Sequence, residues 1–193
     1  MLKLHYAPRT ISVAVAIALE EAGVPYEAIR LDFASGQQTQ PRGGCLHLKT
    51  PDGILTETAA ILEYATPDLV PENPYAAAKM RELMSYLNGT MHPHHAHAIR
   101  GERWSDEESS LADMKRKVPQ RMAECAAYLE EILPTLPFPA GKLEVASDAY
   151  LYVVLSWLAG DGVDIAQFPQ LAAFQHEMNM HKSVQAVFEK GML

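Results

Sequence analysis

The chain has 193 residues, 48% of them hydrophobic and 21% charged, with a formal net charge of -8. This composition is typical of a folded globular protein that buries one large core or two small ones, and it excludes a disordered chain. The acidic balance gives no support for a nucleic-acid partner.

The N-terminal region carries an apolar stretch over residues 11–19 that is followed at once by two glutamates. The stretch is too short to cross a bilayer, and a secretion signal would have a more basic start and a small-residue cleavage site. The two cysteines, Cys45 and Cys125, show no Cys-x-x-Cys spacing, which favours two free thiols in a reducing compartment. We therefore expect a cytoplasmic protein with no membrane association.

The first third of the chain alternates strand and helix patterns. Short apolar or alternating runs bounded by turn residues predict strands at residues 2–6, 26–31, 45–49 and 54–56. Helical patterns are found at residues 12–22 and 58–65. The turn sequence TPDG joins the last two strands as a hairpin. The order β-α-β followed by β-β-α predicts a small mixed sheet with helices on its faces.

The remainder of the chain, after a boundary at about residues 66–73, shows only helical patterns. Asn73 is a suitable N-cap, and Pro74 then occupies the first helical position of a long helix. The core-facing side of that helix is predicted to contain Tyr75, Ala78, Leu83, Leu87 and Met91.

Three further patterns complete the helical part. Residues 105–108, SDEE, predict a capping box ahead of a second long helix that runs to about residue 133. The almost wholly apolar residues 148–158 predict a buried central helix. Two amphipathic helices are predicted near residues 169–180 and 183–190.

Glu57 and Thr58 stand directly ahead of the helix predicted at 58–65, and two interpretations remain open for them. The first is helix capping, in which Thr58 accepts a backbone N–H and Glu57 suits the positive end of the helix dipole. The second is a ligand site, because free N–H groups at a helix start bind a carboxylate while a neighbouring glutamate binds an ammonium.

Four stretches, in order and covering most of the chain, resemble the cytosolic glutathione transferases, and in particular their bacterial beta-like branch. They are KLHYAPRTISVAVAIALEEAGVPYE, DGILTETAAILEY, VASDAYLYVVLSW and FPQLAAFQHEMNMHKSVQAVFEKG. The resemblance implies an α/β thioredoxin-like N-terminal domain over residues 1–66, an all-α helical C-terminal domain over residues 74–193, and a homodimer.

The resemblance also implies a function. Glutathione is then the co-substrate, no metal is needed, and a small hydrophobic electrophile is conjugated or reduced. In the family, a pair matching Glu57-Thr58 holds the γ-glutamyl end of glutathione. This favours the ligand interpretation, because the γ-glutamyl group is a zwitterion that needs both an anion and N–H donors. The alternative function is a non-catalytic binding or protein-interaction module with a degenerate glutathione site.

The reaction centre is less well matched. The beta-like enzymes have a cysteine followed by a serine at the start of the first helix, and here these positions are Ile11 and Ser12. Chemistry through that cysteine is therefore excluded. Ser12, with Thr10 close by, is a candidate to donate a hydroxyl to the glutathione sulfur, although Ser12 is equally suited to capping the helix. Tyr6 supplies the other candidate hydroxyl.

Four histidines lie within six residues, at His92, His94, His95 and His97. His92 matches a histidine that, in the beta-like enzymes, faces the thiol site from the helical domain, so we place it on the electrophile side. The i,i+3 spacing of His92 and His95 also suits a metal pair, but no acidic third ligand is found at the expected position. We therefore favour solvent-facing or cleft-lining histidines.

The chain departs from the family before its third strand. Residues 32–44 are shorter than the corresponding family segment, and Leu46 stands where the family has a cis-proline. We expect a trans bond between Cys45 and Leu46, since a non-proline cis bond costs about 2.5–4 kcal/mol. In the family, the residue before the cis-proline binds the cysteinyl part of glutathione through its backbone. Cys45 and Leu46 would then bind it poorly, and we expect roughly millimolar affinity.

A thiol–disulfide enzyme that uses Cys45 is disfavoured, because that thiol lies on a predicted strand rather than at a helix N-terminus.

Val145 stands where the family usually has a capping serine or threonine at the start of the buried helix, while Asp148 is kept. We expect the fold to survive this change.

Overall fold

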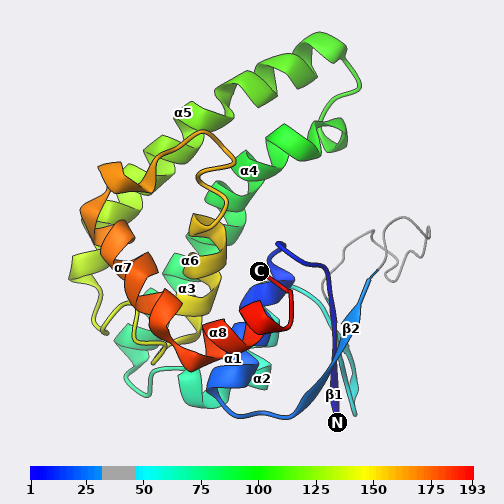
Figure 1. Ribbon diagram of the computed structural model, residues 1–193, viewed down its shortest axis with the longest axis vertical. Coiled ribbons are helices and arrows are strands. Elements are labelled where there is room, and N and C mark those ends of the chain that lie inside the picture. The colour runs from blue at the N-terminus through cyan, green and yellow to red at the C-terminus, as the bar shows by residue number, and fades with distance from the viewer. Residues whose placement is uncertain (32–46) are drawn as a thin grey trace.

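The computed structural model describes residues 1–31 and 47–193 (Figure 1). Its four-stranded sheet consists of β1 (Leu2–Tyr6), β2 (Tyr26–Arg30), β3 (His47–Thr50) and β4 (Gly53–Leu55), in the order β2-β1-β3-β4. β1 and β2 are parallel, whereas β1 with β3 and β3 with β4 are antiparallel. The predicted mixed sheet is confirmed. Cys45 and Leu46, and with them the peptide bond between the two, lie outside the described residues.

Helix α1 (Ser12–Glu21) is the crossover that two parallel strands require. Every residue from Ser12 to Leu19 is buried, because the sheet, α6 and α8 surround the helix. Its sequence, SVAVAIALEE, is apolar on all sides until the last two residues, as expected for a helix enclosed in a core. The start of α1 is therefore held rigidly in the middle of the molecule.

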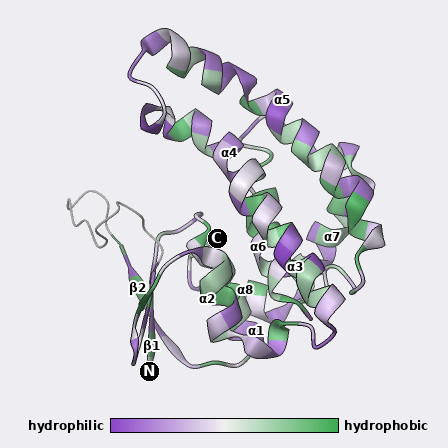
Figure 2. Ribbon diagram, turned by 180° about the vertical axis from the view of Figure 1, so that it is seen from behind, coloured by the Kyte–Doolittle hydropathy of each residue, from purple (hydrophilic) through white to green (hydrophobic). Residues whose placement is uncertain are grey.

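The remaining helices follow the predicted order. They are α2 (Thr58–Ala65), α3 (Pro74–Tyr86), α4 (His92–Ile99), α5 (Glu108–Ile132), α6 (Ala146–Leu155), α7 (Pro169–Met180) and α8 (Lys182–Glu189). Every residue of α6 is buried, which confirms the predicted central helix. Helices α4 and α5 extend together away from the rest of the molecule, and their far ends are largely hydrophilic (Figure 2). No helix of the described residues is both long enough and apolar enough to cross a membrane.

The predicted start of α3 is confirmed in detail. The Asn73 side chain accepts hydrogen bonds from the backbone N–H groups of Tyr75 and Ala76, at 2.9 and 3.1 Å. The core-facing side was predicted wrongly in the first turn, since Tyr75 and Ala78 are exposed. The buried stripe consists of Ala76, Ala77, Met80, Leu83, Met84 and Leu87, and Tyr75 and Ala78 lie on the other side of the helix.

The capping box at residues 105–108 is also wrong. Helix α5 begins at Glu108 with Glu107 as its N-cap, and no side chain caps it. The Ser105 hydroxyl instead accepts the N–H of Glu107, at 3.1 Å. Serine hydroxyls bond readily to the backbone two residues on, so the same residue that caps helices also forms turns.

A π-helical turn, Leu87–Met91, connects α3 to α4. Pro93 follows it in the first turn of α4 and has no N–H to continue the regular hydrogen-bond ladder. The wider turn absorbs this missing bond while the two helices stay in series. The histidine-rich α4 therefore begins immediately after a local distortion.

Candidate active site

The turn between β1 and α1 is built around the Ser12 hydroxyl. Ser12 is fully buried, and its hydroxyl oxygen accepts the N–H of Ala7 at 3.1 Å and lies 3.1 Å from the Ala7 carbonyl. The Thr10 hydroxyl lies 2.7 Å from that of Ser12 and donates to the same carbonyl at 2.9 Å. The N-cap of α1 is Ile11, with no side-chain capping bond, so Ser12 fixes the turn rather than capping the helix.

Hydrogen bonds of the Arg9 backbone connect the same turn to distant parts of the chain. The Arg9 φ of 59° lies in the left-handed region, which a residue with a long side chain adopts only under constraint. Two bonds supply this constraint: the Arg9 N–H donates to the Met192 carbonyl at 2.8 Å, and the Trp157 indole N–H donates to the Arg9 carbonyl at 3.2 Å. The C-terminus accordingly lies beside the start of α1 (Figure 1).

A small cavity of about 70 Å³ opens between this turn and α4. The turn contributes Arg9, Thr10 and Ile11 to its lining. The opposite wall comes from α4 and from the segment after α6, and consists of His92, His95, Ala96, Ile99, Arg100 and Trp157. Of the two predicted hydroxyls in the turn, Thr10 lines the cavity, whereas Ser12 lies behind it in the core.

His92 is a neutral imidazole at pH 7. Burial, followed by electrostatic interaction with His95 and with the Arg100 guanidinium, lowers the His92 pKa from 6.5 to about 4. Neither of its ring nitrogens has a hydrogen bond to another side chain or backbone group of the described residues, and its ring lies 4.9 Å from that of Trp157. The structure therefore brings Thr10 and His92, both candidates from the sequence, to opposite walls of one cavity.

His95 is held by a different contact. Its Nδ1 lies 2.8 Å from the Asp161 carboxylate, and its ring stacks on Trp157 with centroids 4.3 Å apart. Asp161 is 7% exposed, so this carboxylate is nearly removed from solvent and is satisfied by the imidazole. The pair orients Trp157, which in turn bonds to the Arg9 carbonyl. His95 thus supports the turn.

Glu57 is the N-cap of α2, and its backbone is strained. It has φ 70° and ψ 119°, and neither Glu57 nor another side chain makes a capping hydrogen bond there. Glu57 is exposed, whereas Thr58 is 6% exposed and lies beside the Tyr150 hydroxyl of α6. Side-chain capping, one of the two interpretations from the sequence, is not observed. The first N–H groups of α2 are available to a ligand.

The other candidates lie apart from the cavity. Tyr6 is buried in the core and does not line the cavity. His94 and His97 face the groove between α4 and α5, where their rings are 5.9 Å apart. Among the described residues, no group of three or more histidine, cysteine or acidic side chains is placed to hold a metal ion. Cys125 is a free buried thiol whose pKa is raised by burial.

The comparisons with known proteins agree with this fold. A crystal structure of a glutathione transferase homologue from Sulfitobacter, with bound glutathione, has 45% sequence identity to the chain. It superimposes with a TM-score of 0.92, and the match covers 100% of this chain and 99% of the other. The chain belongs to the glutathione transferase family.

Two further relatives support this assignment to the transferases, although no protein-family model matches the chain. A glutathione S-transferase of Escherichia coli is 27% identical, over 95% of this chain and 96% of its own length. The beta-class glutathione S-transferase of Sphingomonas chungbukensis is 25% identical with a TM-score of 0.82, covering 99% and 100% of the two chains. The predicted fold, a thioredoxin-like α/β part with an all-helical part, is confirmed, as is the beta-like branch.

Sequence reasoning missed four residues of this transferase site: Arg9, Arg100, Trp157 and Asp161. Arg9, Trp157 and Asp161 act across long sequence separations, through the Trp157–Arg9 bond and the His95–Asp161 pair. The only available signal was the stretch VASDAYLYVVLSW, in which a tryptophan follows an otherwise continuous apolar helix. An indole N–H in a buried position needs a hydrogen-bond acceptor, but the pattern does not say which one.

Proposed function

We propose that the protein is a glutathione transferase that binds glutathione at the start of α2 and presents its thiol at the start of α1. The observation that carries the proposal is the Glu57 backbone, which is held at φ 70° although its side chain caps nothing. Strain of this kind costs about 1–3 kcal/mol and persists where the surrounding structure or a function requires it. The glutathione bound in the Sulfitobacter homologue supports the same conclusion.

The γ-glutamyl end of glutathione fits this helix start. Its ammonium pairs with the exposed Glu57 carboxylate, and its carboxylate accepts the N–H groups at the start of α2, where the helix dipole is positive. Thr58 supplies the first of these N–H groups and is fixed by packing beside Tyr150. A ligand with both charges is therefore bound better than one with either alone.

The thiol is then directed to the cavity beside Thr10. We assign Thr10 as the hydroxyl that donates to the sulfur. When glutathione binds, the Thr10 proton turns from the Ala7 carbonyl to the sulfur, and the Ser12 hydroxyl, 2.7 Å away, donates to that carbonyl in its place. The start of α1 adds a positive dipole end, and both effects favour the thiolate. His92 lies across the cavity as a neutral donor for the electrophile. Conjugation is the reaction we favour, with thiol-dependent reduction as its variant.

The assembly and location follow the family. We propose a homodimer, supported by the exposed apolar side chains Ile54, Tyr64 and Tyr75 on β4, α2 and α3, which a subunit contact would cover. A cytoplasmic location suits the free Cys125 thiol. Nothing in the described residues or in the relatives favours the non-catalytic alternative.

A matched pair of variants tests the thiol assignment. Conjugation of glutathione with 1-chloro-2,4-dinitrobenzene should be catalysed by the wild type. Thr10→Val should lower kcat by about 10- to 100-fold with little change in glutathione affinity, because a bond to the thiolate is lost. Ser12→Ala should lower thermal stability as well as kcat, since the Ala7 N–H loses its buried acceptor. If Thr10→Val is silent while Tyr6→Phe abolishes turnover, Tyr6 is the thiol-directed hydroxyl.

A further inference from the structure

The cavity beside Thr10 is unusual in its charge. Two arginines, Arg9 and Arg100, line it, and none of the described residues in its lining is an aspartate or a glutamate. Neither guanidinium has an ion-pair partner among residues 1–31 and 47–193. Asp161, which contacts the lining residue His95, is already paired with that imidazole. In a chain of net charge -8, this leaves a local excess of positive charge at the reaction centre.

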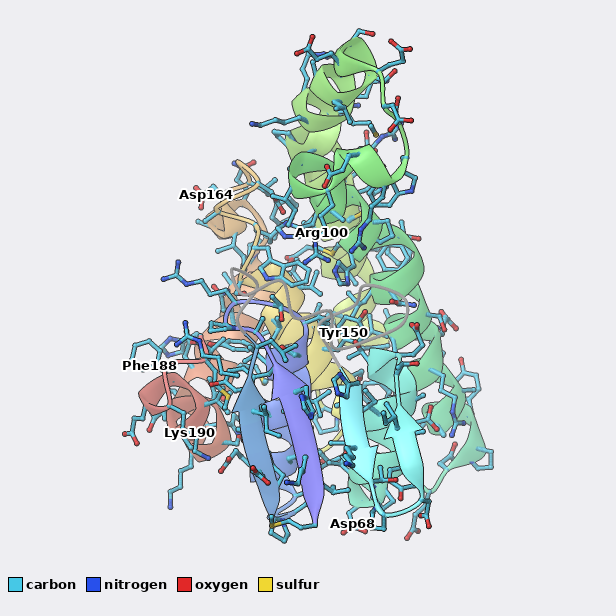
Figure 3. The ribbon with its side chains drawn as sticks, turned by 90° about the vertical axis from the view of Figure 1, so that its right-hand side faces the viewer. Asp68, Arg100, Tyr150, Asp164, Phe188 and Lys190 are labelled. Carbon is cyan, nitrogen blue, oxygen red and sulfur yellow. The ribbon has the colours of Figure 1, made fainter. Side chains whose placement is uncertain are left out.

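Arg100 is better placed than a surface arginine to use that charge. It is half-buried at the end of α4, and its backbone N–H is fixed by the Ala96 carbonyl at 2.8 Å. Figure 3 shows Arg100 beyond the ends of the strands, on the side of α4. Its positive charge acts on a residue that lines the cavity, because it helps to lower the pKa of His92. A planar guanidinium in such a position binds a carboxylate through paired hydrogen bonds.

The lining also contains apolar side chains beside Thr10, His92 and His95. Ile11, Ile99 and Trp157 line the same cavity as the two arginines, so the cavity offers apolar contact as well as a cationic group. At about 70 Å³ it holds a carboxylate and not a whole electrophile, whose body must extend along Ile99 toward solvent. We propose that the transferase selects electrophiles that carry a carboxylate on an apolar body, with Arg100 as the residue that recognises the carboxylate. This inference rests on the proposed function.

The reaction is fully balanced for an aryl chloride. The glutathione thiolate attacks the ring carbon that bears chlorine, a C–S bond forms, and the C–Cl bond breaks as chloride leaves with the electron pair. The thiol proton passes to solvent. A carboxylate held by Arg100 would place that carbon next to the thiolate without taking part in the bond changes.

A charged and a neutral form of one electrophile test this specificity. The probes are 4-chloro-3,5-dinitrobenzoate and its methyl ester, at saturating glutathione. Arg100→Gln should raise KM for the acid by about 10-fold or more, while KM for the ester and for glutathione should change by less than about twofold. Arg116→Gln is the matched control, because Arg116 is exposed on α5, does not line the cavity and has no influence on the His92 pKa, and it should leave all three values unchanged.

Two outcomes would overturn the inference. Equal changes in KM for the acid and the ester in Arg100→Gln would show that the Arg100 charge does not recognise the carboxylate. A raised KM for glutathione with an unchanged KM for the acid would show that Arg100 binds the carboxylate of the tripeptide instead.

Binding measured without turnover separates this inference from the proposed function. In a Trp104→Phe background, Trp157 is the remaining tryptophan, and its fluorescence reports directly on the cavity. The acid should quench the Trp157 fluorescence of Trp104→Phe at a concentration about 10-fold lower than that needed for the double variant that also carries Arg100→Gln. If the acid binds about 10-fold more tightly in the presence of Arg100 but neither probe is conjugated, the transferase assignment fails and the role of Arg100 stands. Equal binding to both proteins would contradict the role of Arg100.

Discussion

Glu57→Gln should weaken glutathione binding by about 1–3 kcal/mol, which is roughly 5- to 150-fold in the dissociation constant. The substitution keeps the size of the side chain and removes the negative charge that pairs with the ligand ammonium. The fold should not be affected, because the Glu57 side chain makes no capping bond in the structure. Isothermal titration with glutathione measures the effect.

Two controls make this result specific. Glu63→Gln removes the same charge from the same helix, where Glu63 pairs with Arg81 on the surface at 2.8 Å, and it should leave the affinity unchanged. Glu57→Gly should abolish binding without lowering the thermal midpoint, since glycine tolerates φ 70°. An unchanged affinity together with a loss of stability in Glu57→Gln would show that Glu57 only stabilises the helix start.

Asp148→Ala should lower the free energy of unfolding by about 2–5 kcal/mol, the largest effect on stability that we expect. Asp148 is fully buried at the start of α6 and accepts the N–H groups of Gly141 and Leu143 at 2.9 and 3.1 Å. These bonds hold a loop in which both Gly141 and Leu143 have positive φ. Truncation leaves two buried donors without an acceptor. Urea unfolding of the wild type and the variant measures the loss.

The same residue predicts a pH dependence. Burial raises the Asp148 pKa from 3.8 to about 7, so the folded protein holds this proton more tightly than the unfolded chain. Its contribution is fully present below about pH 4 and is lost as the pH rises through 7. Relative to Asp148→Asn, which does not titrate, the wild type should lose about 1–3 kcal/mol between pH 5 and pH 8.

The wild type must be compared with Asp148→Asn because the ionisation of His92 changes the stability with pH in the opposite direction. The His92 pKa is lowered to about 4, so its contribution to stability is lost as the pH falls from 6.5 toward 4. This term is the same in the wild type and in Asp148→Asn, and it cancels in their difference. A difference that stays constant from pH 5 to pH 8 would contradict the assigned ionisation of Asp148.

Local signals in the sequence predicted the elements well. The helix at 58–65 has the predicted limits, and Asn73 caps α3 as expected, because capping and turn chemistry act within a few residues. The errors at Tyr75 and at residues 105–108 arose where a side chain had two local options and packing of the whole molecule decided between them. Resemblance, and not periodicity, identified the family.

The site was predicted only in part for the same reason. Thr10, Glu57 and His92 were named as candidates. For Ser12, donation to the thiol and helix capping were both left open, and its hydroxyl lies in the core with the Ala7 backbone as its partner. Which of two nearby hydroxyls faces a cavity depends on the positive φ at Arg9, and that backbone angle is set by Trp157 and Met192. Contacts over such separations leave no pattern in a single sequence.

The most direct test of the account is the ionisation of glutathione bound to the protein. Thiolate absorbance in the ultraviolet, recorded against pH for the complex and for free glutathione, gives the thiol pKa in each state. The dipole of α1 and the Thr10 hydroxyl should lower the bound pKa by about one unit or more from the free-thiol value of about 8.5, and Thr10→Val should reverse most of this change. A bound thiol that titrates at the same pH as free glutathione would contradict the proposed reaction centre.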